Sequence, residues 1–358
     1  MQIYLNMGIR GLTGCIKWAA SPGATVPNWT DFKGKQIGID ILGFLYKAKS
    51  QQSSIFRYLT RFIIACKKHD IIPVPIFDGK PPEEKRNALK QRSALRIKSD
   101  VKQKALEHDL EHIVFSDKQK TILQNEIRSL QSNSSYLTSE ERDQAKQFFY
   151  ACGILSLNAA GEADNVLAYF AKRDMLAAVI SNDLDLLCRG VELLLVPDTY
   201  ALPGDTSGWT QYSLKIILES TGFRYDQFVE MCVLMGCDYT ATLRSLPYKN
   251  AYWAIKRRGT IDKTLALLGI MDTTPYIKAV NNIVGYGETM DTLMGVKQWD
   301  KWTAGAPQSE PLTLLSLRNG ILTDIDEVLF MELTCSITHN SSGIDRISTH
   351  HHPEDTHC

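Results

Sequence analysis

The sequence predicts an α/β fold, with a mainly parallel sheet flanked by helices. Short apolar segments that suit buried strands alternate with segments whose apolar residues recur at helical spacing. Acidic residues stand at the ends of several of these strand segments, where parallel sheets bind their ligands. The predicted strands cover residues 34–40, 71–78, 153–157, 177–180 and 191–196.

Helices are predicted in the remaining segments. A short helix passes through Ile16 and Trp18, and a loop rich in Pro and Gly follows at 21–28. Further helices begin near Gly43, at Ile55 and at Glu162, and beyond residue 205 helices cover 212–219, 225–235 and 248–257. Periodicity is lost from about residue 300, and the composition of 336–358 is typical of a disordered tail.

Two prolines interrupt the second predicted strand. Because proline has no N–H to give to a ladder, Pro73 and Pro75 indicate either an edge strand or positions where that N–H is not needed.

The composition excludes several classes of protein. The 358 residues are 44% hydrophobic and can form one large domain with an appendage. Equal numbers of basic and acidic residues, 40 each, argue against non-specific coating of polyanions, although patches can be segregated. The eight cysteines lack C-x-x-C spacing and fit reduced thiols inside a cell. Without a signal peptide or a long apolar run, we expect neither secretion nor membrane spanning.

Two acid-x-acid pairs mark the candidate site. Glu162 and Asp164 open a helix, and Asp183 and Asp185 follow an apolar strand. In an extended segment, residues two apart point to the same face, so each pair can aim its carboxylates at one point. Such carboxylates repel one another, and an all-oxygen site selects Mg²⁺ or Mn²⁺ to relieve this repulsion. Two ions about 4 Å apart can hold a phosphodiester and lower the pKa of a water.

Three further acids strengthen this prediction over the alternative of two exposed acidic turns. Asp40 and Asp78 also stand at predicted strand ends, and Asp238 follows a predicted helix. Four strand ends with acids are harder to assign to chance than one pair.

A charge-rich insert at 80–137 separates the second and third strands. Its first half carries nine basic residues against Glu83, Glu84 and Asp100; these are Lys80, Lys85, Arg86, Lys90, Arg92, Arg96, Lys98, Lys102 and Lys104. The run is either a solvated helical face or a basic arm beside the acidic site, where a nucleic-acid backbone would enter.

Together these segments resemble the flap endonuclease/XPG family of structure-specific 5′ nucleases, over roughly residues 7–270. The similar segments, in order, are MGIRGL at 7–12, Asp40 in the first acidic strand, FDGKPPEEK at 77–85, GEAD at 161–164, DLD at 183–185 and GCDY at 236–239. In GEAD, Asp164 stands where the family has Glu.

The resemblance implies a PIN-like core, a helical arch and a helix–two-turn–helix element that grips duplex DNA. It divides the chain into a nuclease core at 7–210 with the arch at 80–137, a duplex-binding region at 211–300 and a variable region at 301–358. It implies that Asp78, Glu162, Asp164, Asp183 and Asp185 surround two Mg²⁺ ions, and that Asp40 and Asp238 act through waters. Which carboxylate binds which ion stays open.

The resemblance also assigns roles to residues that contact the substrate. Lys85 and Arg92 match the basic pair that neutralises the scissile phosphate. Tyr46 matches an aromatic that stacks on a base, with core packing as an equal alternative. The implied DNA-binding residues are Gly8, Lys249, Lys256 and Arg257.

Two departures from the family stand out. The family's Gly-[Ile/Val]-Gly hairpin is replaced by the turn at 245–247, and its Pro247 cannot donate an N–H, so binding of a monovalent cation stays open. No sliding-clamp peptide is recognisable near the C-terminus. The start at Met1 or at Met7 is also open.

We therefore expect a Mg²⁺-dependent enzyme that cuts branched DNA at 5′ flaps, nicks or gaps and that also acts as a 5′–3′ exonuclease. We expect it to be monomeric and intracellular, in the nucleus or at a site of DNA replication. The alternatives are an RNA endonuclease of the same fold and a junction-binding protein without catalysis. The H-x-x-E-H pattern at 108–112 resembles a zinc-protease motif but has no evident third ligand.

Overall fold

The computed structural model of the chain describes residues 8–21, 23–50, 54–81, 83, 86–113, 115–134, 137–198, 201–240, 244–285, 289–294, 325 and 327–338. In this part of the chain a seven-stranded sheet has the order β1-β7-β6-β5-β2-β3-β4. Strands β2 to β6 are mutually parallel where they pair, and β7 is antiparallel to both β6 and β1. The α/β fold predicted from the sequence is confirmed.

The strands are short. They are β1 (Ala24–Thr25), β2 (Gln36–Asp40), β3 (Ile72–Phe77), β4 (Leu157–Asn158), β5 (Ala178–Ile180), β6 (Leu193–Pro197) and β7 (Trp209–Ser213). The described helices are α1 (Leu12–Ala19), α2 (Ile41–Ser50), α3 (Ile55–Lys68), α4 (Arg86–His112), α5 (Asp117–Ser134), α6 (Ser139–Ala151), α7 (Ala163–Ala171), α8 (Asp185–Cys188), α9 (Leu214–Thr221), α10 (Tyr225–Met235), α11 (Tyr248–Arg258), α12 (Ile261–Leu267), α13 (Thr274–Val284), α14 (Met290–Leu293) and α17 (Glu327–Thr338), with 3₁₀ turns η2 (Trp29–Phe32) and η4 (Asp238–Thr240).

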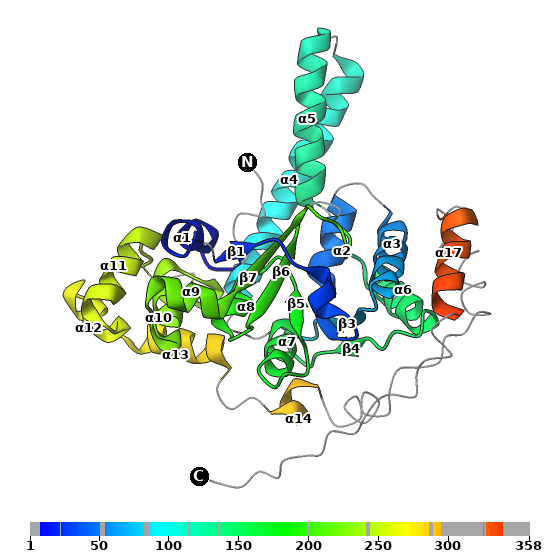
Figure 1. The fold of residues 1–358 in the computed structure, drawn as a ribbon. Helices are drawn as coiled ribbons and strands as arrows, with labels where there is room; N and C mark the ends of the chain where they lie inside the picture. Colours follow the sequence, from blue (N-terminus) through cyan, green and yellow to red (C-terminus); the bar gives the residue numbers. More distant parts are fainter. Residues whose placement is uncertain are drawn as a thin grey trace.

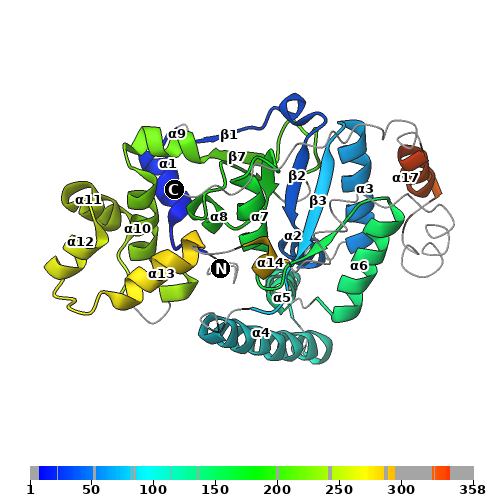
Figure 2. The ribbon, with the colours of Figure 1, turned by 90° about the horizontal axis from the view of Figure 1, so that it is seen from below.

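Helices cover both faces of the sheet. Figures 1 and 2 place α1, α7 and α8–α13 towards one side, and α2, α3, α6 and α17 towards the other. Side chains of each central strand alternate between two cores. Val179 packs into the first core, on the side of α1, α7 and α8–α13, and Ile180 packs into the second core, on the side of α2, α3, α6 and α17. Gly38 of β2 faces the first core, where a Cβ would lie 2.6 Å from the Leu167 side chain of α7. Glycine therefore lets α7 approach β2 closely.

The prolines of β3 occupy positions that do not need an N–H. Strand β3 lies inside the sheet, so the edge position is wrong, but β4 covers it only from Ile76 onwards. The N–H of Ile72 donates to the Lys35 carbonyl on the β2 side. Because successive residues of a strand point their N–H groups to opposite sides, Pro73 and Pro75 face away from β2, beyond the end of β4.

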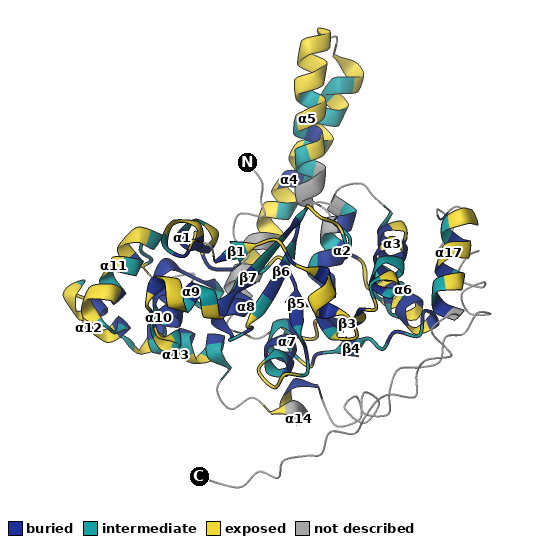
Figure 3. Cartoon of the chain, viewed as in Figure 1, coloured by how far each residue is buried: buried dark blue, intermediate teal, exposed yellow. Residues whose placement is uncertain are grey.

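The insert forms a helical hairpin. Helices α4 and α5 pack side by side and project from the body of the protein (Figure 1), and most of their described surface is exposed (Figure 3). Lys102 on α4 pairs with Glu126 on α5 at 2.6 Å, and Lys104 pairs with Asp100 along α4. Part of the basic run thus stabilises the hairpin itself.

Several predicted bounds need correction. Strand β1 was expected to be loop, and the last two residues of β7 were expected to begin a helix, but the two strands pair with each other and extend the sheet beyond β6. The third predicted strand, 153–157, is reduced to β4, because a turn follows α6 at 152–153 and only Leu157 and Asn158 pair with β3. Helix α17, which packs against α3, overlaps the first three residues of the expected tail; residues 339–358 lie outside the described part.

The seven described cysteines are free thiols, as expected, and all except Cys335 are buried. No helix in the described part of the chain has both the length and the apolar character needed to cross a lipid bilayer.

Candidate active site

Three neighbouring strands bring acids to one edge of the sheet. Asp40 is the last residue of β2, Asp78 directly follows β3, and Asp183 follows β5 after a short loop. Because β2 lies between β3 and β5 and runs parallel to both, these three acids share the carboxyl edge of the sheet. This is the edge predicted from the sequence.

The negative charge of Asp40 is disfavoured by its surroundings. Its carboxylate accepts hydrogen bonds from Gly43 N (3.2 Å) and from Ser181 Oγ (3.0 Å). Nevertheless, burial, followed by the negative charges of Asp78 and Asp183, raises the pKa of Asp40 from its ordinary value of 3.8 to about 7. A cation at this edge would relieve the repulsion.

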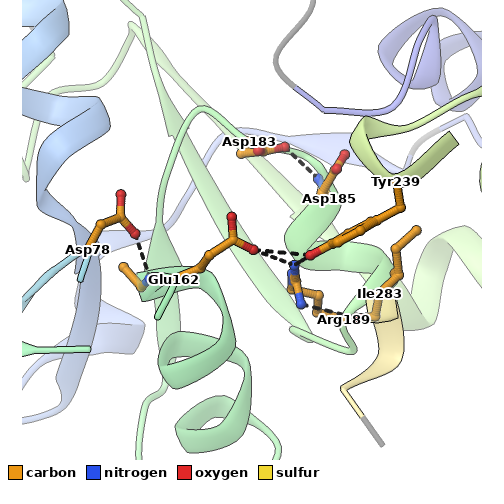
Figure 4. A network of polar contacts seen from close by, with 8 residues as sticks. Asp78, Glu162, Asp183, Asp185, Arg189, Tyr239 and Ile283 are labelled. Atoms are coloured by element: carbon orange, nitrogen blue, oxygen red, sulfur yellow. Dashed lines mark hydrogen bonds and ion pairs between the residues drawn. The ribbon is translucent and has the colours of Figure 1, made fainter. Parts of the chain in front are cut away.

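The first acid-x-acid pair lies at the N-terminus of α7. Glu162 is the N-cap residue with extended backbone angles, and Asp164 lies in the first helical turn. The pair therefore does not lie in one extended segment, and the expected i, i+2 geometry is wrong here. The backbone N–H of Ala163 donates to Oδ1 of Asp78 at 2.6 Å, which joins β3 to the start of α7 (Figure 4).

The second pair lies between β5 and α8. Strand β5 ends at Ile180, so Asp183 stands in the loop and Asp185 begins the helix; this pair is not extended either. Ser181 Oγ accepts from Asp183 N (3.0 Å), and Asp183 Oδ1 accepts from Asp185 N (2.9 Å). The loop is thus folded around the carboxylates that it carries.

The N-terminal segment closes over this second pair. The N–H of Ile9 donates to Oδ1 of Asp185 at 2.6 Å, and Asp185 is 7% exposed. Gly8 has a φ of +82°, and a Cβ there would lie 2.5 Å from Asp183 Oδ1 and 2.6 Å from Asp185 Oδ1. Only glycine suits this position, because any side chain would displace both carboxylates.

A buried arginine that the sequence analysis missed lies behind Glu162. Arg189, at the end of α8, is 3% exposed, and its Nη2 lies 3.5 Å from Glu162 Oε2. The hydroxyl of Tyr239 accepts from the same nitrogen at 3.0 Å and donates to Glu162 Oε2 at 3.1 Å (Figure 4). Burial lowers the pKa of Arg189, but Tyr239, Asp164 and Glu162 outweigh it and raise this pKa above its ordinary value.

The signal for Arg189 was a basic residue directly after the apolar run 186–188 that follows the D-x-D motif. A charged residue in a buried run needs a partner, and the nearest acids in sequence were already candidates.

Asp238 lies in the turn η4 after α10, next to the Tyr239 that contacts Glu162. Among the described residues, however, no three Asp, Glu, His or Cys side chains are arranged to hold one metal ion. The acids share one edge of the sheet, and their convergence around cations stays a prediction. Carboxylates without a cation repel, and several are engaged by donors such as Ala163 N and Ile9 N.

The donor set nevertheless fits hard divalent cations. The acids at this edge offer oxygen ligands, as Mg²⁺ and Mn²⁺ require, and their mutual repulsion is visible at Asp40.

The residues expected to contact the substrate come from different parts of the chain. Lys85 lies outside the described residues, and Arg92 lies in α4. Tyr46, in α2, is half-buried and packs partly against the second core, so stacking and core packing both stay open.

Of the expected DNA-binding residues, Lys249, Lys256 and Arg257 lie on α11. Lys249 Nζ lies 5.5 Å from the ring of Trp18, and Arg257 lies 5.5 Å from that of Trp253. Lys256 Nζ donates to the carbonyls of Thr221 (2.7 Å) and Gly222 (3.1 Å) at the end of α9. Lys256 therefore has a structural partner that the sequence did not indicate.

The zinc-like pattern lies in α4. The rings of His108 and His112 stack at 4.2 Å, and the described residues around them form no group that could hold a metal ion.

The fold and this acidic edge define an α/β protein that carries a carboxylate site at the ends of its parallel strands. Comparison with known proteins is more specific: family models match residues 7–99 (XPG N-terminal domain) and 153–238 (XPG I-region), together half of the chain. The chain belongs to the flap endonuclease/XPG family of nucleases.

Individual relatives support this assignment. Flap endonuclease 1 of Enterocytozoon bieneusi is 29% identical over 290 residues, which cover 76% of each chain. The structure is similar to flap endonuclease-1 from Methanococcus jannaschii, with a TM-score of 0.60, 19% identity, and coverage of 88% of this chain and 97% of that one. It is also similar to the Holliday junction-resolving enzyme GEN1 in complex with product DNA, Mg²⁺ and Mn²⁺, with a TM-score of 0.59, 14% identity, and coverage of 91% and 76%.

Proposed function

We propose that this protein is a Mg²⁺-dependent, structure-specific 5′ nuclease that cleaves branched DNA in replication, repair or recombination. The single observation that carries the proposal is the edge shared by Asp40, Asp78 and Asp183, where burial and the charges of the other two acids raise the pKa of Asp40. Such an edge suits divalent cations, and the family supplies the substrate class.

The proposed cation ligands are Asp78, Glu162, Asp164, Asp183 and Asp185, with Asp40 and Asp238 further out. Two Mg²⁺ ions, which Mn²⁺ can replace, would supply Lewis acidity for hydrolysis of a phosphodiester. The protein's own contribution is to hold the carboxylates: Ser181, Ala163 and Ile9 each donate a hydrogen bond to one of them. Preorganised ligands avoid the cost of ordering them at the moment of reaction.

The helical hairpin α4–α5 would guide the strand that carries the scissile phosphate. A polyanion that approaches seven acids is repelled, and the basic residues of α4 offset this repulsion. We assign the phosphate-neutralising role to Lys85 and Arg92, and base stacking to Tyr46. Replacement of Lys85 or Arg92 by Ala should lower the cleavage rate about 100-fold.

The duplex beyond the junction would lie against α11. Its Lys249 and Arg257 are the proposed phosphate contacts, with Lys256 nearby and Gly8 at the junction itself. The turn at 245–247 ends in Pro247, the N-cap of α11, which leaves one N–H fewer for a phosphate or a monovalent cation.

The proposed organisation is a nuclease core at 7–210 with the arch at 80–137, a duplex-binding region at 211–300 and a variable region at 301–358. We propose that the protein acts as a monomer inside the cell, at sites of DNA replication.

Cleavage of labelled substrates with and without Mg²⁺ tests this function. A 5′ flap, a nicked duplex, a blunt duplex and single-stranded RNA, each offered at equal concentration, separate the candidates. The proposal predicts Mg²⁺-dependent cleavage that is fastest on the flap. Preferred cleavage of the RNA would favour an RNA endonuclease, and Mg²⁺-independent flap binding without cleavage would favour a junction-binding protein.

A further inference from the structure

Arg189 joins three parts of the chain behind the acidic edge. Its Nη2 contacts Glu162 Oε2 at the start of α7 and the Tyr239 hydroxyl in η4. Its Nη1 donates to the Ile283 carbonyl in α13 at 3.3 Å (Figure 4). One guanidinium therefore connects a proposed cation ligand to the helices that follow the sheet.

The contacts that Arg189 and Tyr239 make with Glu162 fall on the same oxygen. Arg189 Nη2 and the Tyr239 hydroxyl lie within 3.5 Å and 3.1 Å of Oε2, respectively, and they also bond to each other at 3.0 Å. A carboxylate oxygen that contacts both a charged guanidinium nitrogen and a hydroxyl is restricted in where it can lie.

If Arg189 had a purely structural role, its burial would cost free energy without a matching gain in stability. The side chain is 4% exposed, and Nε is buried without a hydrogen-bond partner among the described residues. Buried ion pairs are often no more stabilising than apolar side chains of similar volume, and an unsatisfied buried N–H costs free energy. Polar groups that orient a ligand from behind have a functional reason to be buried.

We propose that Arg189 is a positioning residue which, together with Tyr239, fixes Oε2 of Glu162 and thereby orients this carboxylate to bind a divalent cation. The inference rests on the proposed function, because it assumes that Glu162 is a cation ligand. The contact to Ile283 makes the orientation of Glu162 depend on the packing of α13.

Two substitutions isolate orientation from charge. Arg189→Lys keeps the positive charge but loses the planar guanidinium, whose two terminal nitrogens contact Glu162 and Ile283. Tyr239→Phe removes only the bridging hydroxyl. Arg173→Lys is the matched control, because Arg173 is exposed after the end of α7, with its guanidinium 3.5 Å from the centroid of the Tyr169 ring.

Titration calorimetry of Mn²⁺ into the EDTA-treated, full-length protein measures the cation affinity directly, and thermal unfolding reports whether each variant folds. We expect both variants to fold and their Kd for Mn²⁺ to rise about tenfold. The control should stay within about twofold of the wild type, since a conservative exposed substitution has little effect.

The outcomes are distinct. If either Arg189→Lys or Tyr239→Phe folds and binds Mn²⁺ as the wild type does, the inference is overturned while the proposed function stands. If the wild type itself binds no Mn²⁺, the proposed function fails and this inference fails with it.

Discussion

The backbone N–H of Ile9 donates a 2.6 Å hydrogen bond to Oδ1 of Asp185, a residue 176 positions further along the chain. This bond places the N-terminal segment directly on the acidic edge. Gly8, one residue earlier, has no room for a side chain between Asp183 and Asp185.

Substitution of Gly8 by Ala should therefore disable the site. The φ of +82° would cost about 1–2 kcal/mol of unfolding free energy, and displaced carboxylates should slow cleavage about 100-fold. Rates on a labelled flap and urea denaturation measure the two effects.

Gly14→Ala is the matched control, because its Cβ would lie 3.6 Å from Tyr248 in ordinary contact, within α1. It should gain about 0.5–1 kcal/mol in stability and keep its activity. Equal behaviour of the two variants would contradict the crowding argument.

Asp40 should make the stability of the cation-free protein fall as the pH rises. Because its pKa is raised to about 7 in the folded protein, against 3.8 ordinarily, the folded state binds the proton more tightly than the unfolded state between these values. The contribution of Asp40 to the free energy of unfolding is therefore highest below about pH 4 and is lost as the pH rises through about 7.

Asp40→Asn cannot ionise and should lack this decrease. In EDTA, the difference in unfolding free energy between Asp40→Asn and the wild type should shift in favour of the variant by on the order of 4 kcal/mol from pH 4 to pH 8. Urea denaturation across this range measures it, and a constant difference would show that Asp40 has an ordinary pKa.

Substitution of Lys256 should affect mainly stability, whereas substitution of Arg257 should affect mainly DNA binding. Lys256→Met removes two hydrogen bonds to the carbonyls at the end of α9 and should lower the free energy of unfolding by about 1 kcal/mol. Arg257→Met should leave stability unchanged, weaken duplex binding and reduce the salt dependence of that binding by about one counterion.

Urea denaturation and fluorescence titration of a labelled duplex at several salt concentrations measure both properties. Lys256→Met with wild-type stability would show that its contacts to Thr221 and Gly222 contribute nothing.

Local chemistry explains which elements were predictable from sequence. Helix α10 has the predicted bounds 225–235, because its apolar residues repeat at helical spacing and Gly236 follows directly. Strand β7 was missed because Trp209–Ser213 runs straight into α9, and only pairing with β6 and β1 reveals it. Strand β1 has two residues, too few for any alternating pattern.

The acidic edge was predictable for a different reason. Parallel strands force their carboxyl ends together, so Asp40 and Asp78 could be placed side by side without knowing any loop. The helix start at Glu162 was predicted as well, but the position of Asp185 at the start of α8 and the contacts of Arg189 depend on how α7 and α8 pack. Such long-range packing leaves no periodic signal in the sequence.

The most direct test of the central claim uses Asp183→Asn, which keeps the shape of the side chain and removes its charge. The cleavage rate of a labelled 5′ flap in Mg²⁺ and the affinity for the same DNA in EDTA are measured side by side. Loss of a cation ligand should reduce cleavage about 1,000-fold or more while DNA affinity changes little. Cleavage at the wild-type rate would contradict the account, because the acidic edge would then take no part in the reaction.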